Sequence, residues 1–202
     1  MRILCLGAHA DDIEIGCGGT MLRLLEEHPR SEVLWVVFSG DKVRRREAKG
    51  SACEFLKEAG RSRARFLEFE ESFFPDQWAA IKRGFERARR EIEPDIVFTH
   101  TRDDRHQDHR VLWELTWNTF RNHLIIEYEI PKYEGDLGQP NLFVSLTPEL
   151  AQEKTRLIVK HFKSQRTKHW FDAETFMGLM RLRGVESGAR YAEGFYCRKS
   201  VL

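Results

Sequence analysis

The first half of the chain alternates short apolar runs with segments in which apolar residues return every three or four positions. The runs are continuous rather than alternating, which is typical of strands buried on both faces of a parallel sheet. The segments between them have the spacing of amphipathic helices. Strand-then-helix units in succession predict an α/β fold, a mainly parallel sheet with helices on both faces. The predicted strands here are residues 3–7, 32–38, 65–69 and 95–99, and the predicted helices are residues 18–27, 44–59, 76–92 and 109–122.

The pattern loosens in the second half of the chain. Thr147 as N-cap with Pro148 in the first turn predicts a helix over residues 148–162. Residues 135–140 (GDLGQP) indicate a long loop, and there is no internal repeat, low-complexity stretch or linker. We therefore predict one domain over residues 1–202. The other elements predicted here are strands at residues 124–129, 142–146 and 194–201 and a helix at residues 171–183.

Composition removes several classes of function. The 33 basic and 32 acidic side chains give a formal net charge of +1, which argues against a nucleic-acid binder with a strongly basic face. The four cysteines are scattered without a C-x-x-C pair, so neither a disulfide framework nor a cysteine-rich zinc site is expected. The first apolar run is too short for a signal peptide, and no run is long enough for a transmembrane segment. These features predict a cytoplasmic protein.

Histidines and carboxylates cluster directly after two predicted strands. His9, Asp11 and Asp12 follow the first strand, and His106 and His109 follow the fourth. In a doubly wound sheet these two strands are often neighbours, and their carboxyl ends border the crevice where ligands bind. The two segments are thus predicted to line one site, although they lie about a hundred residues apart in sequence.

The residue types suit a catalytic zinc ion, which needs about three His or carboxylate ligands and one open position. His9 and Asp12, three residues apart in one loop, can face a single ion, and His109 can complete the set. The same ligands also accept iron, cobalt or manganese. Asp11 beside the metal can serve as general base toward water and then pass the proton to a leaving amine.

His106 is the second candidate catalytic group. If protonated, it can stabilise the oxyanion of a tetrahedral intermediate, with Asp108 or Asp104 orienting the ring. Either histidine segment alone is more often a solvated loop with capping aspartates, and only their joint position after strands favours a metal site. The glycines after Asp12 lack G-x-G-x-x-G spacing, so a dinucleotide site has little support.

Four segments resemble the PIG-L/LmbE family of zinc-dependent de-N-acetylases, which act on conjugates of N-acetylglucosamine. Residues 9–20 (HADDIEIGCGGT) resemble the family's H-P-D-D-x-E-x-G-x-G-G-T, with Ala10 in place of the usual proline. Residues 104–109 (DRHQDH) match D-x-H-x-D-H. Residues 44–48 (RRREA) are similar to R-x-x-E-A, and residues 191–195 (YAEGF) to Y-A-E-x-F. The resemblance spans nearly the whole chain.

The resemblance implies a Rossmann-like three-layer sandwich with a catalytic zinc. It implies zinc ligands matching His9, Asp12 and His109, a general base matching Asp11, and a histidine matching His106 assisted by the aspartate matching Asp108. The expected reaction is hydrolysis of an N-acetyl group from an amino-sugar conjugate, which releases acetate and a free amine.

Substrate contacts are assigned to three further residues. Arg44 follows the second strand, where it can hold a sugar hydroxyl or a phosphate, although an ordinary charged helix start explains it equally well. Tyr133 belongs to a long segment, residues 127–141, of a kind that is often functional. Arg183 can reach the site or simply end a helix.

Two other functions stay open. One is a zinc amidase of the same fold that cleaves another acyl amine or a thiol conjugate, and the other is an inactive sugar-binding relative. Self-association also stays open, with interface anchors possible among Trp113, Trp117 and Trp170. The remaining histidines are interpreted as structural, although His100 lies close to the predicted site: they are His28, His100, His123, His161 and His169.

Overall fold

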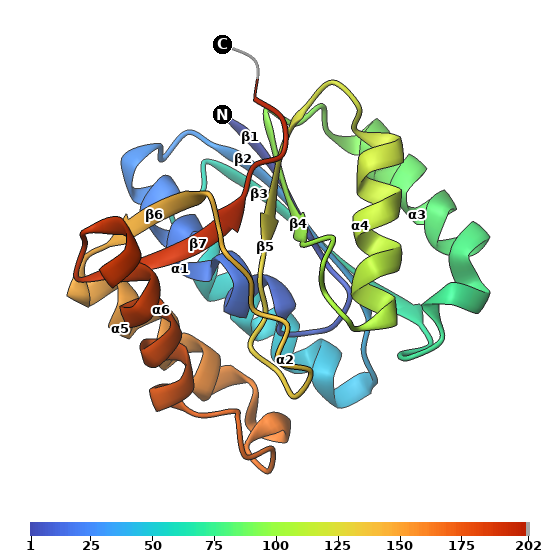
Figure 1. Cartoon of the computed structure of the whole chain (residues 1–202). Coiled ribbons are helices and arrows are strands. Elements are labelled where there is room, and N and C mark those ends of the chain that lie inside the picture. Colours follow the sequence, from blue (N-terminus) through green and yellow to red (C-terminus); the bar gives the residue numbers. More distant parts are fainter. Residues whose placement is uncertain (201–202) are drawn as a thin grey trace.

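The computed structural model describes residues 1–200 and contains a seven-stranded sheet in the order β3-β2-β1-β4-β5-β7-β6 (Figure 1). The first five strands are parallel, β7 is antiparallel to β5, and β6 is antiparallel to β7. The mainly parallel α/β sandwich predicted from the sequence is therefore confirmed. The strands are β1 (Arg2–Gly7), β2 (Glu32–Ser39), β3 (Arg61–Phe69), β4 (Ile96–His100), β5 (Leu124–Tyr128), β6 (Leu142–Leu146) and β7 (Tyr191–Tyr196).

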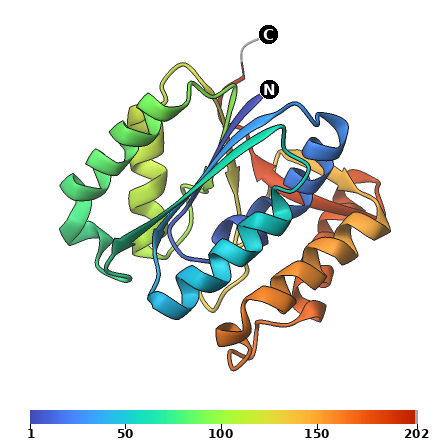
Figure 2. The same cartoon turned by 180° about the vertical axis from the view of Figure 1, so that it is seen from behind.

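Helices cover both faces of the sheet because the strand side chains alternate between two cores. Ile3 and Cys5 of β1 belong to a core with residues of α1, α2 and α5, whereas Leu4 and Leu6 belong to one with residues of α3 and α4. Figures 1 and 2 show these two groups of helices on opposite sides of the sheet. The helices are α1 (Asp12–Glu27), α2 (Lys42–Phe55), α3 (Trp78–Glu91), α4 (Gln107–Thr119), α5 (Pro148–His161) and α6 (Ala173–Ser187), with short 3₁₀ turns η1 (Phe74–Gln77) and η2 (Lys163–Gln165).

Several predicted boundaries differ from the observed ones. Helix α1 begins at Asp12 rather than at residue 18, so the glycines after Asp12 lie inside the helix. Strand β3 begins at Arg61 rather than at residue 65, because an edge strand tolerates charged side chains, and Arg63 there pairs with Glu32 of β2 at 2.8 Å. Strand β7 ends at Tyr196, and Val201 of the predicted final strand lies outside the described residues.

The predicted neighbours β1 and β4 do lie side by side, with Cys5 opposite Phe98. From β1 the chain proceeds to β2 on one side, and from β4 it proceeds to β5 on the other. The carboxyl ends of β1 and β4 therefore form the switch point of the sheet, where ligands bind in folds of this type. Among residues 1–200, no helix combines the length and the apolarity that crossing a membrane requires.

Candidate metal centre and active site

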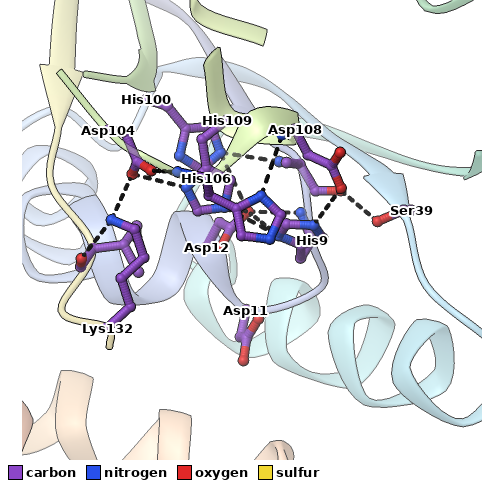
Figure 3. A network of polar contacts seen from close by, with 12 residues as sticks. His9, Asp11, Asp12, Ser39, His100, Asp104, His106, Asp108, His109 and Lys132 are labelled. Carbon is purple, nitrogen blue, oxygen red and sulfur yellow. Dashed lines mark hydrogen bonds and ion pairs between the residues drawn. The ribbon is translucent and has the colours of Figure 1, made fainter. Parts of the chain in front are cut away.

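Two segments at the switch point deliver the clustered side chains. His9 and Asp11 lie in the turn after β1, and Asp12 opens α1. His106 is the N-cap of α4, and His109 lies in its first turn. Figure 3 shows side chains from both segments converging on one place, so the sequence-distant motifs do form one cluster.

Three donor atoms of this cluster lie at the separations of ligands around one ion. His9 Nδ1 is 3.0 Å from His109 Nε2, and Asp12 Oδ2 is 3.4 Å from the first and 3.5 Å from the second. Tetrahedral zinc with bonds of about 2.0–2.1 Å places its ligand atoms about 3.3–3.4 Å apart. The donor set and its spacing therefore fit zinc or a similar divalent transition metal.

Each of the two histidines is held from behind by a carboxylate. His9 Nε2 lies 3.0 Å from Asp108 Oδ2, and His109 Nδ1 lies 2.8 Å from Asp104 Oδ2. Carboxylates in this position fix the ring orientation of metal-binding histidines and make them more basic. The outer partners of a metal site are thus present together with the donor atoms.

The surroundings of the three candidate donors shift their pKa values in different directions. Burial acts to lower the pKa of His9, but the carboxylates of Asp12 and Asp108 outweigh it and raise that pKa to about 10. Burial also acts to raise the pKa of Asp12, yet the surrounding histidines hold it well below its usual value. Burial and the neighbouring His100 lower the pKa of His109 to about 3, so its ring is neutral, whereas a metal ion would have to displace the proton of His9.

His100 is a member of the cluster that the sequence interpretation left as structural. It is fully buried, and candidate ligand groups of the described residues include both His9–His106–His109 and Asp12–His100–His109. His100 Nε2 accepts the backbone N–H of Ala8 at 3.1 Å, and its ring stacks on that of His109 with centroids 3.8 Å apart. His100 Nε2 also lies 3.2 Å from Asp12 Oδ2, but His100 does not line the cavity beside the cluster, so it lies behind the loop that carries His9.

The Asp11 carboxylate does not cap α1, although Asp11 is the N-cap residue of that helix. Its side chain makes no capping hydrogen bond; instead Oδ1 accepts from Arg44 Nη2 at 2.7 Å. Arg44 in turn donates to Glu71 at 3.1 and 3.2 Å, so it is held between two carboxylates. Burial raises the pKa of Asp11 in spite of the Arg44 charge, which makes this carboxylate a better proton acceptor.

His106 is set up as a neutral hydrogen-bond donor. Its Nδ1 accepts the backbone N–H of Asp108 at 3.2 Å, so the proton of the neutral ring lies on Nε2. Burial and the nearby His9 lower the pKa of His106. This arrangement differs from the protonated ring considered from the sequence.

The Asp108 side chain does not hydrogen-bond His106, contrary to the predicted assistance. Its carboxylate accepts from the backbone N–H groups of Ser72 and Phe74 at 2.6 and 3.1 Å and contacts His9. Side chains two residues apart at a helix start point in different directions, which explains the difference. Asp108 therefore positions His9.

Lys132 contacts the same cluster, although no sequence motif marks it. It lies between β5 and β6, and its Nζ is 2.9 Å from Asp104 Oδ2 and 2.7 Å from Asp136 Oδ2 (Figure 3 shows the first contact). Asp104 thus bridges Lys132 and His109. No local sequence motif indicates that Lys132 contacts Asp104, because the two residues belong to segments that are far apart in sequence.

His9, Asp11, Asp12, His106 and His109 line a cavity of about 230 Å³. Arg44 and Tyr133, both predicted substrate contacts, line it, and Tyr133 is 66% exposed at its wall. Trp113 and Trp117 do not line this cavity. Their indole N–H groups donate to the buried carboxylate of Glu127. The lining residues are His9, Asp11, Asp12, Ile15, Arg44, Glu71, His106, His109, Ile130, Lys132, Tyr133, Glu134, Lys168 and Trp170.

Arg183, the third predicted substrate contact, lies outside this cavity. Its guanidinium is buried and pairs with Glu129 at 2.7 and 2.8 Å, with Glu186 at 2.9 Å and with the carbonyl of Gly138 at 3.1 Å. These contacts fasten the segment after β5 to α6. The position indicates a structural role and not substrate contact.

Replacing Arg183 with methionine is expected to lower the free energy of unfolding by about 3–5 kcal/mol, because Glu129 is left buried without its partner. Zinc affinity of the folded protein is expected to be unchanged. Urea unfolding followed by circular dichroism and a zinc titration measure the two effects. The exposed Arg190→Met is the matched control, expected within about 0.5 kcal/mol of wild type. Unchanged stability with a raised KM would restore the substrate role.

The family profile described as PIG-L, GlcNAc-PI de-N-acetylase, matches residues 4–120, more than half of the chain. The uncharacterized deacetylase YaiS of Escherichia coli K12 is 29% identical over 172 residues, which cover 79% of this chain and 89% of that protein. The matched range contains every donor and catalytic candidate described above.

Solved structures show the same fold at lower identity. The N,N'-diacetylchitobiose deacetylase of Pyrococcus horikoshii has a TM-score of 0.71 and 23% identity, covering 96% of this chain and 82% of that one. GalB, the 4-carboxy-2-hydroxymuconate hydratase of Pseudomonas putida KT2440, has a TM-score of 0.75 and 17% identity, covering 100% and 97%. Since a deacetylase and a hydratase share this fold, the fold alone does not determine the reaction, which depends on the residues of the site.

Proposed function

Because the chain belongs to the PIG-L family of de-N-acetylases, we propose that it is a metal-dependent hydrolase of N-acetylated amino-sugar conjugates. It removes the N-acetyl group and releases acetate and a free amine. The observation that carries the proposal is the position of the Asp11 carboxylate in the same cavity as the donor atoms of His9, Asp12 and His109. The proposed ligands of the metal are these three residues, and zinc is the proposed ion.

The chemistry that zinc supplies in such a site is Lewis acidity toward a carbonyl and activation of water. Arg44 engages Asp11 Oδ1, so Oδ2 is the atom proposed to accept the proton of the attacking water. Asp11 then carries that proton to the leaving nitrogen. His106 Nε2–H donates to the oxygen that gains negative charge at the acetyl carbon, and as a neutral donor it needs no protonation step.

The cavity wall is proposed to hold the sugar. Tyr133 presents an exposed ring beside the site, and rings of this kind suit the apolar face of a sugar. Both terminal nitrogens of Arg44 are already engaged by Asp11 and Glu71, so its first role is to hold the base. Contact between Arg44 and a sugar hydroxyl remains part of the proposal because Arg44 lines the cavity.

A screen for acetate release over N-acetylated sugar conjugates, with zinc present, tests the function. Release from at least one conjugate, together with near-stoichiometric metal in the purified protein, is the expected result. Metal without acetate release would favour an amidase acting on another acyl amine or thiol conjugate. Absence of any transition metal would exclude the enzyme and favour the inactive sugar-binding relative.

Replacing Asp104 with asparagine is expected to weaken zinc binding by about 10–100-fold, the usual effect of losing an outer partner of a metal ligand. The reason is that His109 Nδ1 and Lys132 both depend on the Asp104 carboxylate. Competition with a chromophoric chelator measures the affinity. Asp103→Asn, at an exposed neighbouring carboxylate, is the matched control and is expected to bind zinc as wild type does. Equal affinities of the two variants would remove Asp104 from the site.

A further inference from the structure

Helix α1 is interrupted one turn after the ligand Asp12. Cys17 has φ −140° and ψ 15°, which is not helical, and it divides α1 into a short first turn and a longer second part. In an unbroken helix the amide of Gly19 donates to the carbonyl of Ile15, and the amide of Thr20 to that of Gly16. The interruption lies where the chain passes from the cavity into the core.

A buried ion pair from two distant elements hydrogen-bonds to the backbone on both sides of the interruption. Glu193 of β7 accepts from the amides of Gly19 and Thr20 at 2.9 and 2.6 Å. Lys154 of α5 donates to the carbonyl of Ile15 at 2.6 Å and to Glu193 at 2.6 Å. Lys154 and Glu193 are 3% and 4% exposed. The Gly19 amide is thus linked to the Ile15 carbonyl by a chain of hydrogen bonds through the side chains of Glu193 and Lys154.

Packing at the interruption is close. A Cβ on Gly16 would lie 2.2 Å from the Tyr128 ring, and one on Gly19 would lie 2.5 Å from Leu146 and 3.1 Å from Glu193. The contact at Gly16 is too short for any side chain unless the Tyr128 ring moves, and a side chain at Gly19 would displace Leu146 and crowd Glu193, so both glycines allow the close packing. The carboxylate of Glu193 also lies at the amino end of the second part, where the helix dipole favours negative charge.

The first turn of α1 carries the residues that face the cavity. The amide of Ile15 donates to the carbonyl of Asp11 at 3.0 Å, and Ile15 itself lines the cavity. The carbonyl of Ile15 is the point where Lys154 holds this turn. The same turn carries Asp12, whereas His109 belongs to another segment, so a change at that carbonyl is expected to alter the position of Asp12 relative to His109.

We propose that Lys154 and Glu193 are positioning residues that keep α1 divided and so place Asp11 and Asp12 opposite His109. This inference rests on the proposed metal site. Stability alone is a poor reason for such a pair, because a buried ion pair is often replaceable by apolar side chains without loss of stability. The pair contacts backbone groups on both sides of the interruption, and these contacts fix the position of the first turn of α1 relative to the rest of the helix.

The test is the double variant Lys154→Met with Glu193→Gln, which leaves no unpaired buried charge. The zinc dissociation constant, measured by chelator competition well below the unfolding temperature, is expected to rise about 10–100-fold, as for other outer positioning groups. The matched control is Arg156→Met with Glu153→Gln, which removes an exposed ion pair from the same helix α5. The control is expected to bind zinc as wild type does.

Cooperative thermal unfolding shows that each variant is folded. If the double variant fails to fold, Glu193→Gln alone, which keeps the shape and one acceptor, is measured in its place. A folded variant with a zinc affinity within twofold of wild type would overturn the positioning role. Wild-type protein that binds zinc but releases no acetate would overturn the proposed function only, since the affinity comparison still decides the positioning role. Wild-type protein that binds no zinc would overturn both.

Discussion

Asp11→Asn is expected to lower the rate of acetate release by about 10²–10⁴-fold, the usual contribution of a general base, while the metal stays bound. Asparagine keeps the shape of the side chain but cannot accept the proton of the attacking water. Arg44 remains paired with Glu71, so the change leaves that guanidinium with a partner. Acetate release and metal content are measured on the same samples.

The matched control for this prediction is Asp76→Asn, at an exposed aspartate in η1 outside the cavity. It is expected to keep wild-type activity and metal content. Full activity of the Asp11 variant would reject Asp11 as the base. Loss of activity together with loss of metal would instead make Asp11 a determinant of metal binding.

His9→Gln is expected to abolish stoichiometric zinc binding, whereas His100→Gln is expected to retain it. The two histidines belong to different candidate ligand groups, but only His9 lines the cavity. A lost ligand is expected to cost more than the roughly 100-fold that losing an outer partner costs. Glutamine at position 100 keeps an oxygen acceptor for the Ala8 N–H. Because both variants exchange a buried histidine for glutamine, each is the matched control of the other.

Metal content after dialysis and the zinc dissociation constant measure this difference. The reverse result, with zinc lost from the His100 variant and kept by the His9 variant, would replace His9 by His100 in the ligand set. Activity is expected to follow metal content in both variants.

The layers of the fold could be predicted because continuous apolar runs mark strands buried on both faces. Val33, Leu34 and Trp35 belong alternately to the two cores, which requires helices on each side of the sheet. The start of β3 was missed because arginines at the sheet edge carry no apolar signal. The start of α1 was missed because glycines and charges in residues 12–19 hide a helix whose first turn is held by Lys154.

The candidate site could be predicted as far as its residues lie in two short segments that follow strands. His9, Asp12 and His109 meet because β1 and β4 are neighbours. Glu71, Lys132 and Lys154 could not be selected in advance, since each acts through a contact with an element far away in the chain. Arg183 and the Asp108 carboxylate face partners that the sequence does not indicate, because local motifs do not state which partner a side chain will contact.

The separation of the two segments that carry the proposed ligands also bears on the order of folding. His9 and His109 are 100 residues apart in sequence. Strand β4 pairs with β1 only after the intervening elements, which include β2 and α2, have been synthesised. Contacts of such long range form late, after the entropy of a large loop has been overcome. A metal ion that needs both segments can stabilise the chain only after this crossover is complete. Uptake of the ion is therefore expected to be a late kinetic step, one that locks the two halves of the sheet together and slows their separation.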